Sequence, residues 1–133
     1  MDHRYGIDTS IFVRLLTGDP HEQYEKTVNA LECRLRKEPK TEYFVSNQVI
    51  GEAYVAIQHH YGIAKDEARN ALLSVLTSGL CSPLHGAAVL DAIRSRSGCG
   101  LMDRLIASDY AANGLRSLTN DVKMSRLANA EKL

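Results

Sequence analysis

The sequence predicts an α/β protein, a three-layer α/β/α sandwich built on a mostly parallel sheet of four or five strands. Short β-type runs alternate with longer helical segments along the chain, which is typical of a parallel sheet with helices on both faces. The 133 residues contain no repeat or low-complexity linker, and 44% of them are hydrophobic. Such a chain can bury a core of its own, so we expect a single domain over residues 1–133.

The N-terminal half is predicted to contain two strands and three helices. The β-type runs are short, and the helical segments end at turn-forming residues. Ser46 is a preferred N-cap residue and Gly62 a preferred helix end, so the third helix is bounded on both sides. The expected elements are a strand over residues 4–8, a helix over 10–17, a helix over 21–37, a strand over 43–45 and a helix from Ser46 to about His60.

The C-terminal half is predicted to add three helices and the remaining strands. Ala68, Leu72 and Val75 recur on one side of a helical segment, and Gly114 is suited to end another helix. The expected elements are helices over residues 64–76, 86–96 and 101–113, strands over residues 80–81 and 115–119, and a helical turn followed by an edge strand after Asp121.

The net charge of the chain neither favours nor excludes a nucleic-acid partner. Sixteen Lys and Arg residues balance sixteen Asp and Glu residues, whereas a strongly basic chain would itself favour a polyanionic partner. Any attraction for phosphate must therefore come from a local patch or from a bound metal ion.

The cysteines and the N-terminal residues bear on the cellular compartment in which the protein is expected. Cys33, Cys81 and Cys99 form no CxxC pair and have no histidine at a zinc spacing, which favours free thiols in a reducing environment. The start MDHRYGIDTS lacks the apolar run of a signal peptide, and no stretch approaches the length of a membrane span. We therefore expect a cytoplasmic protein with no membrane partner.

Four acidic residues stand where apolar segments meet polar ones. Carboxylates are the ligands that Mg²⁺ and Mn²⁺ prefer, and ligands of open α/β sheets gather at the carboxyl ends of the strands. Asp8 ends the first expected strand, Asp121 follows the last clear one, and Asp103 lies in the first turn of its helix. Glu52 lies beside the apolar arc of its helix, from which it can reach over the edge of the sheet.

Each acid taken alone also has a simpler structural explanation. Asp8 suits a turn or cap, Glu52 a solvated helix face, Asp103 a first helical turn, and Asp121 a turn after Asn120. Only the four together, in this order and in these elements, predict a metal site.

The segments around these acids resemble the sequence blocks of PIN-domain ribonucleases, most closely the VapC-type toxins of bacterial toxin–antitoxin pairs. The blocks are IDTSIFVRLLTGD, VIGEAYVAIQHHYG, LMDRLIASDYAANG and LRSLTND. The similarity extends from Gly6 to about Arg126. It implies a PIN-like fold for the sandwich predicted above.

The resemblance also implies a metal-dependent endoribonuclease that hydrolyses RNA and leaves a 5′-phosphate and a 3′-hydroxyl. A bound Mg²⁺ or Mn²⁺ would lower the pKa of a water molecule and neutralise charge on the scissile phosphate. The catalytic and metal-binding residues carried over from the family are Asp8, Glu52, Asp103 and Asp121, and the supporting positions are Thr9, Ser10, Thr119 and Asn120. The family further implies a homodimer and a cognate antitoxin protein that blocks the site, often with an inserted basic side chain.

Several other polar residues need an interpretation. Asp109 lies six residues after Asp103, off its helical face, which favours a structural or supporting role over direct ligation. His59 and His60 suit the C-terminal end of a helix. Basic side chains are candidates to contact the RNA backbone, although solvated surface positions explain them equally well. These candidates are Arg14, Arg94, Arg96, Arg104, Lys123 and Arg126.

Two alternatives compete with the nuclease interpretation. The first is a catalytically inactive PIN scaffold that binds protein or RNA, in which the four acids are caps or relics. The second is a phosphotransferase with Asp8 as nucleophile, but such enzymes place a second Asp two residues later, where this chain has Ser10. The second alternative is therefore the weaker one.

Overall fold

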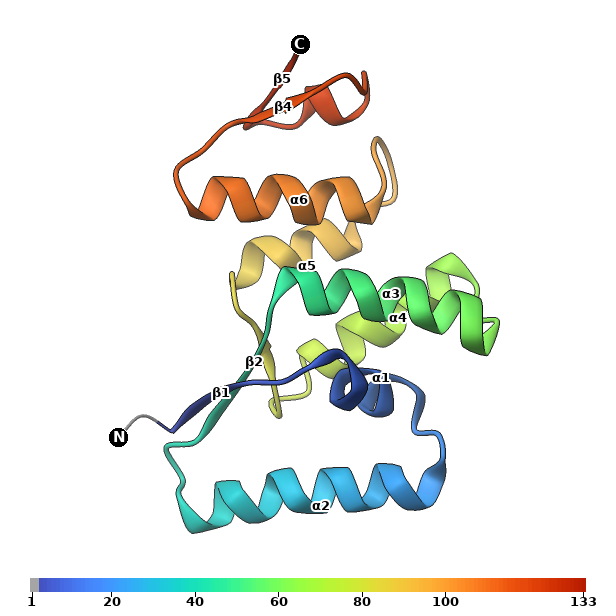
Figure 1. Cartoon of the computed structure of the whole chain (residues 1–133), viewed down its shortest axis with the longest axis vertical. Helices are drawn as coiled ribbons and strands as arrows, with labels where there is room; N and C mark the ends of the chain where they lie inside the picture. The colour runs from blue at the N-terminus through green and yellow to red at the C-terminus, as the bar shows by residue number, and fades with distance from the viewer. Residues whose placement is uncertain (1–2) are drawn as a thin grey trace.

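The computed structural model describes residues 3–133 and has the α/β class predicted from the sequence, with helices and parallel strands alternating along the chain. In chain order the elements are β1 (Arg4–Gly6), α1 (Thr9–Thr17), α2 (His21–Lys37), β2 (Glu42–Val45), α3 (Asn47–Tyr61), α4 (Lys65–Leu76), β3 (Ser82–Pro83), α5 (Ala87–Arg94), α6 (Leu101–Ala112), β4 (Ser117–Thr119), the 3₁₀ turn η1 (Met124–Arg126) and β5 (Ala130–Lys132). Figure 1 shows α2 at one end of the long axis and β4 with β5 at the other.

The strands form two parallel sheets. In the first sheet β2 lies between β1 and β3, and Tyr5 pairs with Tyr43. In the second sheet β4 pairs with β5, with Leu118 opposite Glu131. The single sheet of four or five strands expected from the sequence is thus divided into three strands and two, and α5 and α6 lie between the two parts in Figure 1.

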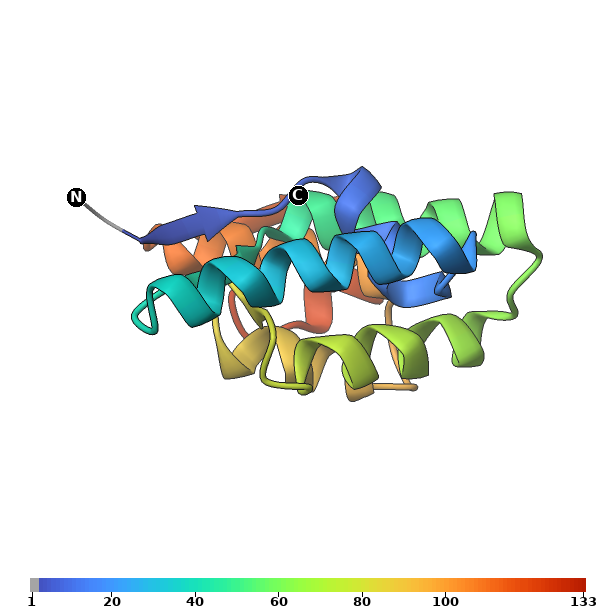
Figure 2. The ribbon, with the colours of Figure 1, turned by 90° about the horizontal axis from the view of Figure 1, so that it is seen from below.

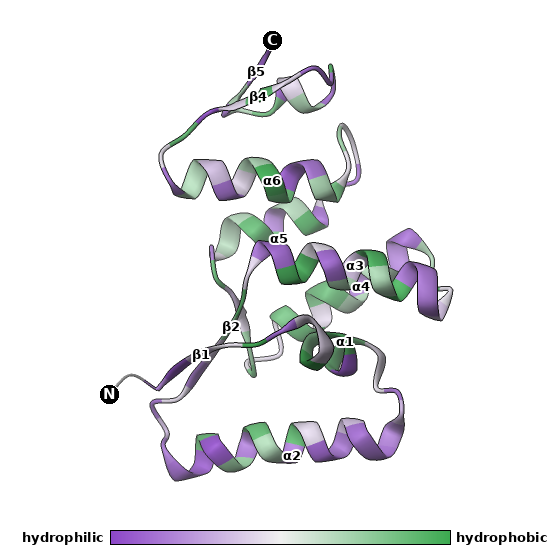
Figure 3. Ribbon diagram, viewed as in Figure 1, coloured by the Kyte–Doolittle hydropathy of each residue, from purple (hydrophilic) through white to green (hydrophobic). Residues whose placement is uncertain are grey.

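The main core joins the first sheet to the helices around it. It includes fully buried side chains such as Phe12 of α1, Ile50 of α3 and Leu72 of α4, and burial of each large apolar side chain stabilises the fold by about 1.5–3 kcal/mol. Figure 2 shows α4 and α5 in one layer, on the side opposite β1 and α3. Figure 3 shows that α2 is mostly hydrophilic, and Leu31 is its buried residue.

A second, smaller cluster lies between α6 and the C-terminal segment. Cys99, Ala107 and Met124 are buried together, and Leu127 packs against them. This cluster fixes the segment that carries η1 against α6. Strand β4, which precedes this segment, also contacts α6.

The helix ends follow local chemistry closely. Ser46 Oγ accepts a hydrogen bond from Val49 N (3.2 Å) and caps α3, as predicted. The same helix ends at Gly62, whose φ of 64° lies in the left-handed region that glycine adopts without strain. None of the helices in the described part of the chain has the length and apolar character required to cross a bilayer.

Several boundaries differ from the prediction by two residues. The first strand ends at Gly6 rather than at residue 8, and β4 begins at Ser117 rather than at residue 115. The strand expected at residues 80–81 is found at Ser82–Pro83, and the helix expected to end at residue 96 ends at Arg94. Ser95 has extended backbone (φ −68°, ψ 129°), so the helix cannot continue. The carbonyl oxygen of Ser95 instead accepts a hydrogen bond from Arg69.

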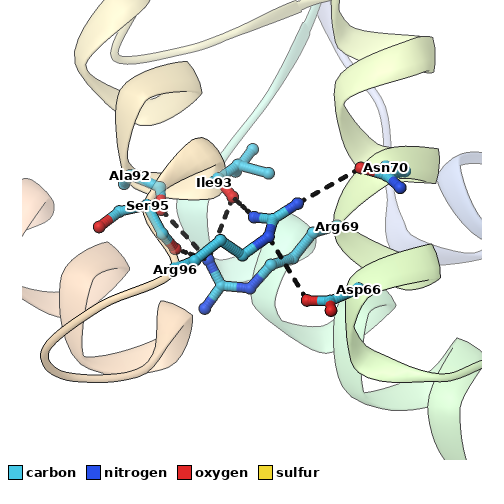
Figure 4. A network of polar contacts seen from close by, with 7 residues as sticks. All are labelled: Asp66, Arg69, Asn70, Ala92, Ile93, Ser95 and Arg96. Carbon is cyan, nitrogen blue, oxygen red and sulfur yellow. Dashed lines mark hydrogen bonds and ion pairs between the residues drawn. The ribbon is translucent and has the colours of Figure 1, made fainter.

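Arg69 of α4 is a buried charged residue that holds the end of α5. Its Nη1 donates to the carbonyl oxygens of Ile93 (3.1 Å) and Ser95, and its guanidinium lies 6.0 Å from the Tyr54 ring centre. Arg96 adds hydrogen bonds to Ile93 O (2.7 Å) and to Asn70 Oδ1 (3.3 Å) (Figure 4). The terminal carbonyls of a helix have no partner inside the helix, so these arginines satisfy them and join α4 to α5.

Replacing Arg69 with methionine tests this contribution. We expect Arg69→Met to lower the free energy of unfolding by about 2 kcal/mol, because hydrogen bonds to a charged group are lost and buried carbonyls remain unsatisfied. The matched control is Arg94→Met on the same connection, where an exposed ion pair with Asp91 (3.5 Å) is worth less than about 0.5 kcal/mol. Urea denaturation measures both. Equal losses in the two variants would contradict the assigned role of Arg69.

Candidate metal centre

Asp8 stands between β1 and α1 and caps the helix. Its backbone is extended (φ −88°, ψ 175°), and its Oδ1 accepts hydrogen bonds from Ser10 Oγ (2.7 Å) and Ile11 N (3.1 Å). The second bond satisfies one of the N–H groups that a helix start leaves free. Both bonds use Oδ1, so Oδ2 remains available to an external ligand. The side chain is exposed to solvent.

The same contacts fix the charge of Asp8. They lower the pKa of its carboxyl below the ordinary value of 3.8, first through the Ser10 hydroxyl and then through the Ile11 amide. The carboxyl is therefore ionised at neutral pH, which is the form that binds a cation.

Glu52 of α3 lies beside the start of α1. Its Oε2 accepts a hydrogen bond from Thr9 Oγ1 (2.8 Å), and its Oε1 accepts one from Gln48 Nε2 (3.2 Å). Thr9 directly follows Asp8, so it joins the two segments that carry these carboxylates. The structure thus brings together four of the predicted site residues, Asp8, Thr9, Ser10 and Glu52.

Asp103 lies in the first turn of α6 and is half-buried. Helices α3 and α6 approach closely at Gly51, where an added Cβ would lie 2.9 Å from Met102 Cε. The missing side chain of Gly51 therefore allows the helix that carries Asp103 to approach the helix that carries Glu52. Within residues 3–133, no hydrogen bond or ion pair joins Asp103 to another predicted site residue.

Asp121 follows β4 and lies three residues before the start of η1. Its Oδ1 accepts a hydrogen bond from Met124 N (2.7 Å), and its own N–H donates to Thr119 Oγ1 (3.0 Å). Thr119 therefore orients the backbone of Asp121, whereas Asn120 is exposed. Because β4 lies beyond α6 and away from β1 in Figure 1, Asp121 is carried by a part of the molecule remote from Asp8.

Within one chain the four predicted ligands do not converge. Over the described residues, no three His, Cys, Asp or Glu side chains come together in a group that could hold a metal ion. Asp8 and Glu52 suit a divalent cation, since both are exposed carboxylates linked through Thr9. Asp103 and Asp121 are not placed with them. Asp121 lies apart from Asp8 because it follows β4, which belongs to the second sheet rather than to the sheet that contains β1.

A buried polar residue beside Glu52 was missed by sequence reasoning. A pocket of about 710 Å³ lies between α3 and α6, and Asn47 and Glu52 both line it. Asn47 Nδ2 donates to Leu105 O (3.0 Å), while its buried Oδ1 has no partner within the described residues. Asn47 directly follows the predicted cap Ser46, but its burial depends on the packing of α6 against α3 and could not be predicted.

Asp109 lines the same pocket and has a partner from another element. His85 Nε2 lies 3.1 Å from Asp109 Oδ1, an ion pair when the imidazole is protonated. His85 has no visible partner in the sequence because it precedes α5, whereas Asp109 lies on α6. This pairing gives Asp109 a structural contact and is compatible with its expected role outside the metal-binding set.

The basic candidates divide by their contacts. Arg104 donates to the carbonyl oxygens of Ser97 (2.6 Å) and Cys99 (3.2 Å), so it holds the α5–α6 connection. Arg96 and Arg94 are also engaged, as described above. Arg14 lines a hollow with His60 and with Thr9 and Ser10, the two residues that follow Asp8.

The fold and these residues define an α/β protein with an acidic centre at the start of α1. Comparison with known proteins is more specific: a model of the PIN domain family matches residues 5–130. The chain therefore belongs to the PIN domain family, whose members are generally nucleases that use divalent metal ions. No curated protein and no solved structure matches the chain.

Substitutions at Asp8 separate its capping role from its charge. Asp8→Ala is expected to lower the free energy of unfolding by about 1 kcal/mol, whereas Asp8→Asn changes it by only a few tenths, because asparagine is an equally good N-cap. The lowered pKa adds a pH dependence. Its stabilising contribution is present above the ordinary value of 3.8 and is lost as the pH falls through the lower folded value.

Thermal unfolding in the absence of divalent metal, at pH 7 and at acidic pH, measures both effects. If Asp8→Asn were as destabilising as Asp8→Ala at pH 7, the charge rather than the cap geometry would be the stabilising feature.

Proposed function

We propose that this PIN domain is a metal-dependent endoribonuclease and the toxin of a toxin–antitoxin pair. Family membership over residues 5–130 supports nuclease chemistry. The observation that carries the proposal in this chain is the Thr9 hydrogen bond to Glu52, which joins two carboxylates at the start of α1. The RNA substrate, the toxin role and the choice between Mg²⁺ and Mn²⁺ are parts of this proposal.

The proposed mechanism assigns separate tasks to the residues at the start of α1. Asp8 stays ionised because Ser10 and Ile11 donate to it, and Thr9 holds the Glu52 carboxylate in place. Asp8 and Glu52 would hold the cation, with Asp103 and Asp121 as the further proposed ligands. When bound, the cation activates water and offsets charge at the phosphate. Arg14, beside Thr9 and Ser10, is positioned to contact the RNA backbone.

The proposed partners are an antitoxin protein, which would block this site, and a second copy of the chain. The principal alternative is an inactive PIN scaffold that binds protein or RNA. The lack of convergence among the four acids in the described residues favours that alternative. Cleavage assays distinguish the two.

The first assay compares wild type with Asp103→Asn on a mixed RNA pool containing Mg²⁺ or Mn²⁺. We expect wild type to produce fragments with 5′-phosphate ends, and we expect the variant to lose at least about tenfold in rate, because removal of a metal ligand weakens charge stabilisation at the phosphate. End-mapped fragments provide the measurement. Equal cleavage by both proteins, or no cleavage by either protein with either metal, would contradict the nuclease proposal and support the inactive PIN scaffold.

Thr9 offers a second test with a conservative control. Thr9→Val removes the hydroxyl that donates to Glu52, and we expect about a tenfold loss of cleavage, the usual scale for a residue that orients a metal ligand. Thr9→Ser keeps the hydroxyl and should retain most activity. Because the contact is exposed, the melting temperature should change little in either variant. A Val variant as active as the Ser variant would exclude this positioning role.

A further inference from the structure

We propose that two copies of this chain complete one another's catalytic centre by pairing β4 of each copy with β1 of the other, so that Asp121 of one copy joins Asp8 and Glu52 of its partner. This inference rests on the proposed nuclease function for its catalytic meaning. It starts from the two sheets, each of which ends in an unpaired edge strand beside one of the acids.

The edge of β1 is open for pairing. Strand β1 is the outer strand of its sheet, and all its residues are exposed. His3 O and Ile7 N bond to β2. Backbone groups alternate between the two edges of a strand, so Arg4 and Gly6 present theirs to the open edge. At Gly6 a Cβ would meet nothing within 4 Å, which leaves room for another backbone.

The edge of β4 is open in the same way. Ser117 N and Thr119 O bond to the β5 side, so the backbone groups of Leu118 point away from β5. The Leu118 side chain is 65% exposed, and the nearby Leu115 and Val122 are 54% and 51% exposed. An unpaired strand with exposed apolar side chains is a template for pairing with another chain.

Pairing inside one chain is opposed by the packing of α6. In Figure 1 this helix lies between β4 and the first sheet. It contacts α3 and α5 on one side and β4 on the other, and the cluster of Cys99, Ala107 and Met124 holds the C-terminal segment there. A second copy satisfies both open edges without disturbing these contacts. The pairing is reciprocal, so it closes into a twofold dimer.

The pairing has a chemical consequence because of where the acids stand. Asp8 follows β1 after one intervening residue, and Asp121 follows β4 at the same distance along the chain. Parallel strands end at the same edge of a sheet, where ligands collect, so parallel pairing brings these carboxylates to one place. Carboxylates held together repel one another unless a cation lies among them. The dimer should therefore be favoured by a divalent cation.

Mixing two inactive variants tests the shared centre. In a dimer of two Asp8→Asn chains, or of two Asp121→Asn chains, both catalytic sites lack one of the proposed metal ligands and should be inactive. A mixed dimer has one site with both substitutions and one with neither, so an equal mixture should recover about a quarter of wild-type cleavage, given random exchange in a twofold dimer. Recovery supports the proposal. If both variants are folded and inactive and the mixture stays inactive, the shared site is overturned and the nuclease proposal stands.

The oligomeric state gives a readout that does not depend on activity. Leu118→Pro removes the N–H that faces the open edge of β4, whereas Lys132→Pro removes one at the outer edge of β5, which the proposal does not use. Light scattering after gel filtration, with Mn²⁺ or with EDTA, should show a metal-favoured dimer for wild type and Lys132→Pro and a monomer for Leu118→Pro. Circular dichroism checks that both variants are folded.

A monomeric wild type in Mn²⁺ would overturn the pairing, as would a folded Leu118→Pro protein that remains dimeric. If wild type cleaves no RNA at all, the nuclease proposal fails, and light scattering still decides whether the strands pair between copies.

Discussion

Guanidinium groups hold the connection between α5 and α6, and the placement of the C-terminal third depends on them. Arg69, buried in α4, accounts for the carbonyls of Ile93 and Ser95. Arg104 then holds Ser97 and Cys99 from the start of α6. Carbonyls at the end of a helix and in the following turn would otherwise face the protein without donors. The direction in which α6 leaves this turn is therefore set by charged hydrogen bonds as well as by apolar burial.

The elements predictable from the sequence were those determined by neighbouring residues. Ser46 and Gly62 bound α3 through local capping, and the αL conformation of Gly18 ends α1 where a turn was expected. The end of α5 was wrong by two residues because it is decided by Arg69, which is distant in the chain. The division of the sheet was not predicted either, and neither was the packing of Met124 against Cys99 and Ala107, which are distant from it in the chain. Pattern and propensity contain no information on such pairings.

The same distinction applies to the candidate centre. The sequence located Asp8 and its neighbours Thr9 and Ser10, and the structure adds the contact with Glu52. The buried Asn47 and the His85–Asp109 pair were missed because each is created by the packing of α6 against another element. Helix packing decides which acids face one another, and a linear motif specifies only their order. The PIN family match extends over residues 5–130, whereas the four acids do not come together within one chain over the described residues.

The capping contact of Asp8 would couple the proposed cation binding to the dynamics of α1. Its Oδ1 bonds the amide of Ile11, so opening of the first helical turn breaks that bond. A cation held by the same carboxylate would restrict this fraying, and the Ile11 amide would exchange its hydrogen more slowly with solvent. Hydrogen exchange at this single backbone position would thus report occupancy of the centre in the absence of any substrate.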